Sequence, residues 1–219
     1  MAIMARNVSK VIGDPPTQVL SEISLRIDDG EFVALTGKSG SGKSTLLYLL
    51  STLDKVSGGV VEIEGQDISQ LSTREIHRFR NSNVGFVFQF HYLIAELTAI
   101  DNILLPAKKR GEEKVRLPYA EFLLGQFGLS GKNGRLPRQL SGGEQQRVAI
   151  ARSLVMKPKY LFADEPTGAL DSINGELVMK ILNESNEKFG TTILMVTHDP
   201  DYASLAKRQV RLADGRVVS

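Results

Sequence analysis

The sequence contains no cysteine, and its 27 basic and 25 acidic residues leave a formal net charge of only +2. The lack of cysteine excludes disulfides and thiolate chemistry, and it suits a reducing compartment. Because the charges are scattered and form no long basic tract, nothing in the composition favours nucleic-acid binding. We therefore expect no nucleic acid among the partners.

Long apolar runs are missing too. A helix that crosses a membrane needs about 20 consecutive apolar residues, whereas the longest runs here, around 33–35 and 193–196, have the length of strands. The first residues lack the apolar stretch followed by small residues that marks a secretory signal. We expect a cytoplasmic protein, in which no segment of this chain crosses a bilayer.

The chain does contain alternating strand and helix signals. Its 219 residues, 42% of them hydrophobic, can bury one sizeable core. Residues 21–27 and 59–63 read as a small antiparallel sheet, and the runs 32–35, 84–88, 160–163 and 192–196 alternate with helical stretches, as in a mostly parallel α/β sheet. Residues 90–156 show helical spacing only. We predict one domain over 1–219, with a core at about 1–89 and 157–219 and a helical subdomain at about 90–156.

A glycine-rich string follows the strand at 32–35 and precedes a helical run at 45–51, which is the P-loop pattern in its strand–loop–helix context. Glycines let backbone N–H groups approach phosphate oxygens, and the helix N-terminus adds positive potential. Lys43 is predicted to reach the terminal phosphates, and the Ser44 hydroxyl to bind Mg²⁺. The alternative is a glycine-rich turn with an incidental lysine. The predicted nucleotide-binding residues are Gly37, Lys38, Ser39, Gly40, Ser41, Gly42, Lys43, Ser44 and Thr45.

Two carboxylates follow the apolar strand at 160–163. Asp164 and Glu165 come directly before Pro166, at the carboxyl end of a strand, where a parallel sheet presents its ligands. We predict that Asp164 holds Mg²⁺, and that Glu165 polarises the water that attacks the γ-phosphate. An acidic turn that only closes a buried strand is the alternative.

A third motif separates this chain from other P-loop proteins such as kinases and GTPases. The string Leu140-Ser141-Gly142-Gly143-Glu144-Gln145-Gln146-Arg147 resembles the signature motif of ABC ATPases. Ser141 is expected to be an N-cap, so that the helix after it offers its N-terminus to an anion. Further motifs stand in the family's order: Gln89, then Ala169-Leu170-Asp171, then Thr197-His198-Asp199. The resemblance covers essentially the whole chain.

The resemblance implies a P-loop NTPase (RecA-like) α/β core, a small antiparallel β subdomain and a helical signature subdomain. It also implies ATP and Mg²⁺ as ligands, with Gln89 sensing the metal and the attacking water and His198 contacting the γ-phosphate. Asp171 would lie at a homodimer interface, where Ser141, Gly142, Gly143 and Glu144 of one copy complete the ATP site of the other. The implied catalytic set is Glu165, His198, Gln89 and Lys43, and the metal set is Ser44, Gln89 and Asp164. His77 and His91 match no motif, so no catalytic role is assigned to them.

Within the family, residues 89–106 and 167–172 resemble the branch of LolD-type lipoprotein-release ATPases and MacB-type exporters, with FtsE-type ATPases nearby. That branch implies integral membrane permease partners, which hold the ATPase on the cytoplasmic face of the inner membrane. An apolar cluster is the expected docking surface, and core packing is its alternative: Phe90, Tyr92, Leu93 and Ile94. An ATPase that regulates a membrane partner mechanically without transport stays open as a second function.

One position departs from the family pattern. Where many relatives place a tyrosine that stacks on adenine, residues 9–13 offer Ile12. Ring stacking is worth about 0.5–1.5 kcal/mol, which is less than the charged phosphate contacts contribute, so nucleotide binding is expected to survive. The selectivity for ATP over GTP is the property that this departure affects.

Overall fold

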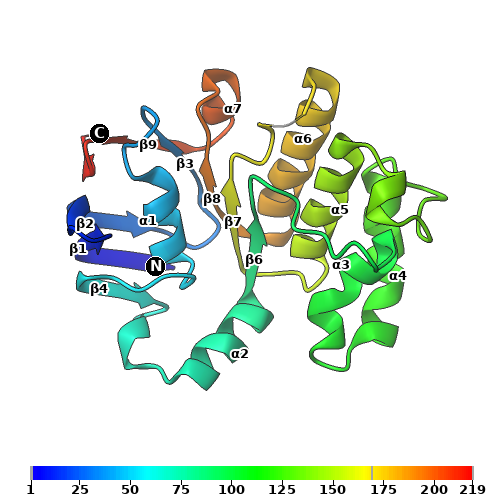
Figure 1. The fold of residues 1–219 in the computed structure, drawn as a ribbon, viewed down its shortest axis with the longest axis horizontal. Helices are drawn as coiled ribbons and strands as arrows, with labels where there is room; N and C mark the ends of the chain where they lie inside the picture. The colour runs from blue at the N-terminus through cyan, green and yellow to red at the C-terminus, as the bar shows by residue number, and fades with distance from the viewer. Residues whose placement is uncertain (1, 169, 219) are drawn as a thin grey trace.

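A computed structural model of the chain describes residues 2–168 and 170–218. Two β-sheets and a group of helices lie side by side (Figure 1). The helices are α1 (Lys43–Leu50), α2 (Thr73–Asn83), α3 (Ala99–Lys108), α4 (Glu113–Gln126), α5 (Gly142–Leu154), α6 (Ser172–Phe189) and α7 (Pro200–Ser204), with short 3-10 turns η1 (Ile68–Gln70) and η2 (Pro137–Gln139).

The first sheet has four strands in the order β2-β1-β4-β5, all antiparallel. The second has six strands in the order β10-β9-β3-β8-β7-β6, and only the β9–β10 pair is antiparallel. The strands are β1 (Ile3–Ile12), β2 (Thr17–Ile27), β3 (Phe32–Thr36), β4 (Gly58–Ile63), β5 (Gln66–Asp67), β6 (Val84–Val87), β7 (Tyr160–Asp164), β8 (Thr192–Val196), β9 (Arg208–Ala213) and β10 (Arg216–Val217).

The parallel sheet separates two hydrophobic cores, because successive residues of a strand point to opposite faces. In β7, Leu161 and Ala163 pack with α3 to α6, whereas Tyr160 and Phe162 pack with α1 and the antiparallel sheet. All five residues of β7 and of β8 are buried, which explains why these strands read as continuous apolar runs. In Figure 1, α1 lies on one side of this sheet and α5 and α6 on the other.

The strand register brings the predicted motifs to one edge of the sheet. Leu35 and Asp164 both pair with Val196 across neighbouring strands, and Val87 pairs with Ala163. The carboxyl ends of β3, β6, β7 and β8 therefore lie level with one another. The loops that follow these four strands carry the P-loop, Gln89, Glu165 and His198.

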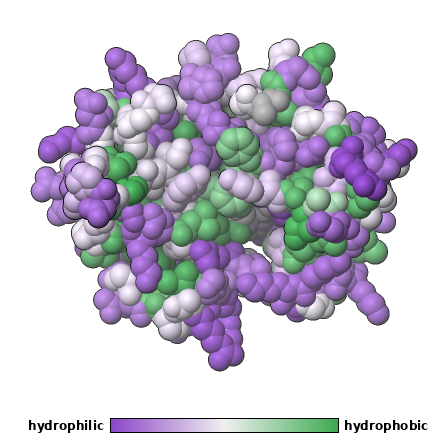
Figure 2. Space-filling model, viewed as in Figure 1, coloured by the Kyte–Doolittle hydropathy of each residue, from purple (hydrophilic) through white to green (hydrophobic). Residues whose placement is uncertain are grey.

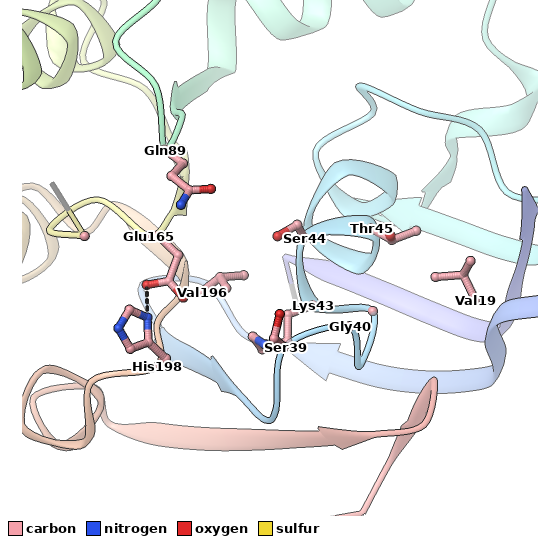
Figure 3. A pocket seen from close by; sticks show the side chains of 12 residues that line it. Val19, Ser39, Gly40, Lys43, Ser44, Thr45, Gln89, Glu165, Val196 and His198 are labelled. Atoms are coloured by element: carbon pink, nitrogen blue, oxygen red, sulfur yellow. Dashed lines mark hydrogen bonds and ion pairs between the residues drawn. The ribbon is translucent and has the colours of Figure 1, made fainter.

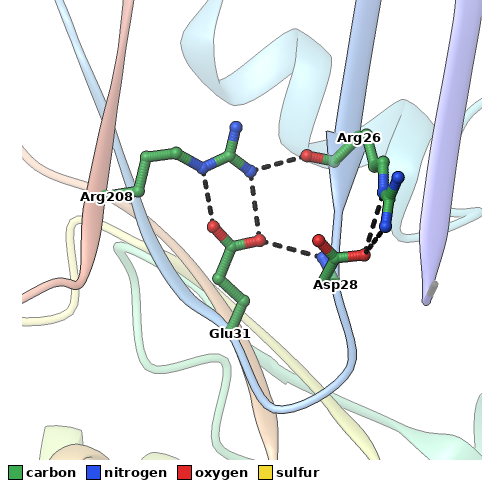
Figure 4. Close-up of polar contacts among 4 residues, drawn as sticks. All are labelled: Arg26, Asp28, Glu31 and Arg208. Carbon is green, nitrogen blue, oxygen red and sulfur yellow. Dashed lines mark hydrogen bonds and ion pairs between the residues drawn. The ribbon is translucent and has the colours of Figure 1, made fainter.

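A polar network at the opposite edge joins the two sheets (Figure 4). Arg208 of β9 donates to both carboxylate oxygens of Glu31, at 2.6 and 3.1 Å, and to the carbonyl oxygen of Arg26 of β2 at 2.6 Å. Glu31 also accepts from the backbone N–H of Asp28 at 2.9 Å. A bidentate arginine–carboxylate pair fixes geometry well, so this network holds the turn between β2 and β3 against β9.

The α/β fold class and the four strands of the parallel sheet predicted from the sequence are confirmed, with boundaries that agree within one residue. The elements described between 90 and 156 are all helical. The sequence reading missed β1, the short β5 and the β9–β10 hairpin. β1 lies between β2 and β4 and has register shifts at several positions, which blur the alternation that marks a strand.

The surface in the view of Figure 2 is mostly hydrophilic, and hydrophobic side chains gather in patches over the middle of the face and over the helices beside it. Among the described residues, no helix combines the length and the hydropathy that a membrane crossing requires.

Candidate functional site

The glycine-rich loop is shaped by close contacts that exclude side chains. Gly37, Gly40 and Gly42 all have positive φ angles, of 141°, 78° and 97°. A Cβ atom on Gly37 would lie 2.2 Å from the carbonyl oxygen of Leu212, and one on Gly42 would lie 2.6 Å from a methyl of Leu20. L-residues rarely adopt this backbone region. The loop conformation therefore depends on glycine at these positions.

Lys43, the first residue of α1, turns its side chain back across the loop. Its Nζ donates to the carbonyl oxygens of Gly37 and Lys38, both at 2.9 Å, and the residue is buried. An ammonium group has three hydrogens, so these two bonds leave one for another acceptor. The positive charge is thus fixed at the centre of the loop, at the N-terminus of a helix whose dipole also favours an anion.

Asp164 joins the acidic strand to the P-loop helix. Its Oδ1 accepts from the Ser44 hydroxyl at 2.9 Å, and its Oδ2 accepts from the Tyr48 hydroxyl at 3.0 Å. Burial, with the nearby Asp164 carboxylate adding to it, raises the pKa of Tyr48 to about 12. Tyr48 therefore stays a hydrogen-bond donor at neutral pH. The hydroxyl and the carboxylate predicted to hold Mg²⁺ are thus neighbours, and both offer the oxygen ligands that this cation prefers.

Glu165 follows Asp164 with a strained backbone, at a φ of 48°, and this turns its side chain out of the strand. Its N–H donates to the carbonyl oxygen of Val196 at 3.0 Å. Its Oε2 lies 2.9 Å from Nδ1 of His198, as Figure 3 shows. The Glu165 side chain is 15% exposed and that of His198 is 74% exposed. The carboxylate is therefore mostly buried, whereas the imidazole that contacts it is open to solvent.

Lys43, Ser44, Glu165 and His198 line one cavity of about 470 Å³, whereas Asp164 is not among its lining residues. Gln89 reaches into it from the end of β6, opposite the P-loop (Figure 3). Ile12 is not among the residues that form its walls, and it lies exposed where the β1–β2 hairpin pairs it with Thr17. Val19 of β2 and Val196 of β8 are its apolar lining residues. The lining residues are Val19, Ser39, Gly40, Gly42, Lys43, Ser44, Thr45, Gln89, Glu165, Gly168, Val196 and His198.

The signature motif lies elsewhere. Ser141 is the N-cap of α5, where its hydroxyl accepts from the N–H of Glu144 at 3.3 Å while the Glu144 carboxylate accepts from the N–H of Ser141 at 2.9 Å. Lys132 also contacts that carboxylate, and this hydrogen bond is the largest influence that lowers the pKa of Glu144. Ser141 and Gly142 are exposed. The walls described for the cavity include no residue from 141–144, so one copy does not bring the two motifs together.

Asp171 begins α6 in the same manner. Its carboxylate accepts from the N–H of Asn174 at 2.9 Å and from the Asn174 side chain at 2.6 Å, and the backbone bond is the main cause of its lowered pKa. Asn174 in turn contacts Arg147 of α5. Asp171 itself is exposed and tied to the signature helix through this chain of contacts. Ala169 of the same motif lies outside the described residues.

Several residues that shape the site were not singled out by sequence reasoning. Tyr48 reads as one more apolar-face residue of α1, and only the fold shows that its hydroxyl meets Asp164. No catalytic role is predicted for His91, and its Nδ1 lies 2.6 Å from Oε1 of Gln146. The position of Gln146 within the signature string was the signal available. Its partners come from residues 88, 91 and 166, far away in sequence.

The apolar cluster expected to dock a partner is mostly on the surface. Phe90 and Tyr92 are 66% and 64% exposed, and Ile94 is exposed as well. Leu93 instead packs partly buried against the core. Aromatic side chains left in water are unusual for a segment whose only role is packing.

Comparison with known proteins places these features in a family. The profile described as ABC transporter matches residues 20–168. The lipoprotein-releasing system ATP-binding protein LolD of Leptospira interrogans is 54% identical over 99% of this chain and 91% of its own length, and that of Aquifex aeolicus is 49% identical over 99% and 96%. The macrolide export ATP-binding/permease protein MacB of Sodalis glossinidius is 47% identical over 94% of this chain, which spans 32% of that longer protein.

Solved structures agree with this fold. A dimeric ATP-binding cassette in a post-hydrolysis state, bound to ADP and phosphate, superposes with a TM-score of 0.91 at 39% identity, over 99% of this chain and 97% of that one. A dimeric bacterial ABC transporter cassette gives the same TM-score at 40% identity, with the same coverage.

Proposed function

Because this chain belongs to the ABC transporter family, we propose that it is the ATP-hydrolysing subunit that powers the release of lipoproteins from a membrane by a separate permease. The observation that carries this proposal is a complete hydrolytic set around one cavity, in a chain that resembles LolD relatives along nearly its whole length. A subunit of a transporter that exports other compounds would share this site, as the similarity to MacB indicates.

In the proposed reaction, the P-loop backbone and the Lys43 ammonium bind the terminal phosphates of ATP. Glu165 accepts a proton from the attacking water, while Gln89 orients that water from across the cavity. The bond from His198 to Glu165 holds the carboxylate in place. A neutral imidazole that donates through Nδ1 leaves Nε2 as an acceptor, so His198 gives up its bond to Glu165 when its exposed side chain turns to donate to the γ-phosphate.

We propose that Ser44 and Asp164 hold Mg²⁺ together with Gln89. The fit rests on the 2.9 Å bond between the Ser44 hydroxyl and Asp164 Oδ1, which already places two hard oxygen ligands side by side. When bound, the cation neutralises charge that develops on the phosphates during transfer. Tyr48 keeps the second oxygen of Asp164 engaged and so fixes the direction in which the first one faces.

The exposed signature motif supplies the remaining part of the site in a second copy. We propose that Ser141, Gly142, Gly143 and Glu144 of one molecule face the γ-phosphate held by its partner, with Asp171 at the interface and two ATP molecules between the copies. An isologous dimer satisfies both sites at once, because each copy offers the same two surfaces. ATP binding then closes the dimer, and hydrolysis and phosphate release open it.

The docking surface for the permease is proposed to be the exposed cluster of Phe90, Tyr92 and Ile94, with Leu93 anchoring it to the core. This cluster follows Gln89 directly in the sequence. A movement of Gln89 during hydrolysis would therefore be passed to the permease through adjacent residues. Residues 90–156 are proposed to move as a helical subdomain against the core at 1–89 and 157–219. The ATPase would then lie on the cytoplasmic face of the inner membrane, held there by its partner.

The experiment that tests the function is affinity purification of the chain from membranes, followed by reconstitution of the purified complex in vesicles that contain an acylated lipoprotein. We expect an integral partner with four spans and a large extracytoplasmic domain, and ATP-dependent transfer of the lipoprotein to a soluble acceptor. ATP hydrolysis without transfer of lipoprotein would contradict lipoprotein release and leave the ATPase intact. Copurified DNA or ribosomes would contradict the transporter subunit as a whole.

A further inference from the structure

One buried amide touches the backbone beside both predicted catalytic groups. Gln146 of α5 is 1% exposed. Its Nε2 donates to the carbonyl oxygen of Phe88 at 3.3 Å and to that of Pro166 at 3.2 Å. Phe88 immediately precedes Gln89, and Pro166 immediately follows Glu165. A single side chain therefore spans the two loops that carry the water-orienting amide and the general base.

The partners fix the orientation of this amide. Both carbonyl oxygens are acceptors, so the NH₂ group must face them and Oε1 must face His91. Oε1 lies 2.6 Å from Nδ1 of His91. Nδ1 of His91 therefore carries a hydrogen, as it does in one neutral tautomer and in the imidazolium. The contact survives in either charge state, and His91 acts as a fixed donor that holds the amide in place.

A second side chain of α5 holds the same loop further along. Arg152 donates from Nη2 to the carbonyl oxygen of His91 at 2.8 Å and from Nη1 to that of Tyr92 at 2.7 Å. Burial lowers the pKa of its guanidinium, which nevertheless stays charged at neutral pH. α5 thus holds the segment after Gln89 at two places, and its N-cap Ser141 is the signature serine.

We propose that Gln146, held in place by His91, is a positioning residue that sets where Gln89 lies relative to Glu165. The proposal rests on ATP hydrolysis at the site described above. Catalysis by a placed water and base is sensitive to small displacements, because a shift of about 1 Å can cost about 100-fold in rate. The contacts described for Gln146 and His91 involve residues 88, 91 and 166 and no residue of the P-loop, so the contacts of Lys43 and the loop backbone with the phosphates of ATP are expected to remain.

The competing explanation is that Gln146 only satisfies two buried carbonyl groups, as many buried amides do. The chain offers a matched control for that role. Asn186 of α6 is 5% exposed, and its Nδ2 donates to the carbonyl oxygens of Gly30 and Thr191 at 2.9 and 2.8 Å. Asn186 makes the same kind of bonds as Gln146, but away from the cavity.

The test compares Gln146→Leu with Asn186→Leu in the full chain, by measuring the kcat and KM of ATP hydrolysis and the thermal midpoint of each variant. We expect Gln146→Leu to lower kcat about 10- to 100-fold with an unchanged affinity for ATP. Asn186→Leu is expected to lower the thermal midpoint comparably and to keep the wild-type kcat. Equal losses of kcat in the two variants, or a change confined to KM, would overturn the proposal.

Variants of His91 give a second comparison, in which the buried Gln146 side chain is retained. His91→Leu leaves Oε1 of Gln146 without a donor, whereas the side-chain NH₂ of His91→Asn can replace Nδ1. We expect His91→Leu to lose several-fold in kcat and His91→Asn to retain most of it. Equal activity of the two variants would contradict the proposed role of His91 in holding the Gln146 amide in place. A wild-type chain that fails to hydrolyse ATP at all would contradict the proposed function itself, so the two failures are distinguishable.

Discussion

The P-loop side and the signature side of this chain differ in where their polar groups find partners. Around the P-loop, Lys43 is bonded to the carbonyl oxygens of its own loop, and Ser44 is bonded to Asp164 at the end of a neighbouring strand. The signature groups Ser141 and Glu144 cap their own helix with a reciprocal pair of bonds, Glu144 also contacts Lys132, and Ser141 is exposed. The first side is a site assembled within one molecule. The second is an exposed helix start, for which we propose an anion held by another molecule as the ligand.

This difference predicts which substitutions alter the properties of a single copy and which alter only the properties of the dimer. A change on the P-loop side should alter ATP binding or chemistry in any state of the chain. A change at the signature should leave ATP binding to a single copy unaltered and reduce only what the dimer does. The following predictions test that division, and the variants can be compared in the same assays.

The largest effect is expected for Glu165→Gln, which keeps the shape of the side chain and removes the base. Phosphate release should fall about 100- to 10,000-fold, while ATP binding persists, so the ATP-bound dimer accumulates. Phosphate assays and light scattering with ATP and Mg²⁺ measure the two results. Glu31→Gln is the control, since Glu31 is comparably buried at 18% exposure but bonds Arg208 away from the cavity. Only monomer in light scattering of Glu165→Gln would contradict this assignment.

Lys43→Ala comes next, because it removes a charge from the centre of the loop. A hydrogen bond to a charged group contributes about 1.5–3 kcal/mol, so we expect the Kd for ATP to rise about 10- to 100-fold. Titration with a fluorescent ATP analogue measures this. Lys10→Ala is the control: Lys10 donates to the carbonyl oxygen of Lys55 and pairs with Asp54 outside the cavity. An unaltered titration curve for Lys43→Ala would refute the role of this ammonium.

Ser141→Ala should have a smaller and more selective effect. Loss of the signature hydroxyl is expected to lower turnover about 10-fold in the dimer, through one bond to a charged phosphate, without weakening ATP binding to a single copy. It also removes an N-cap, worth about 1 kcal/mol of stability. Ser72→Ala isolates that part, because Ser72 caps α2 with the same reciprocal pair of bonds, to Glu75. If both variants lose turnover equally, the signature contact in trans is wrong.

The smallest effect concerns Tyr48 and pH. Burial beside Asp164 raises the pKa of Tyr48 from 10.0 to about 12, so the folded chain keeps the phenol proton at a pH where the unfolded chain has lost it. This contribution to stability is present below about pH 10 and is lost as the pH rises towards 12. Tyr48→Phe should therefore show a shallower decline of the urea midpoint between pH 9 and pH 11 than the wild type. Parallel declines would contradict the raised pKa.

Sequence reasoning predicted the parallel sheet well, because its strands are buried on both faces and read as short apolar runs bounded by turns. Residues 192–196 match β8 without error. β1 was not predicted because bulges shift its register, and β10 was not predicted because a strand of two residues is too short to show a pattern. Within the site, motifs with fixed spacing were found, whereas Tyr48, Val19 and Gln146 were not. Tyr48 contacts Asp164 and Gln146 contacts Phe88, in each case across a large sequence separation.

The sequence alone determined the family and the chemical groups, because a P-loop, an acidic strand end and a signature helix start are local patterns whose residues are neighbours in the chain. Only the tertiary structure decided how they meet. The register of β3, β6, β7 and β8 aligns four loops at one sheet edge. The buried amide of Gln146 on α5 then bonds to two of these loops. Such contacts depend on strand order and packing, which join residues that no local pattern relates.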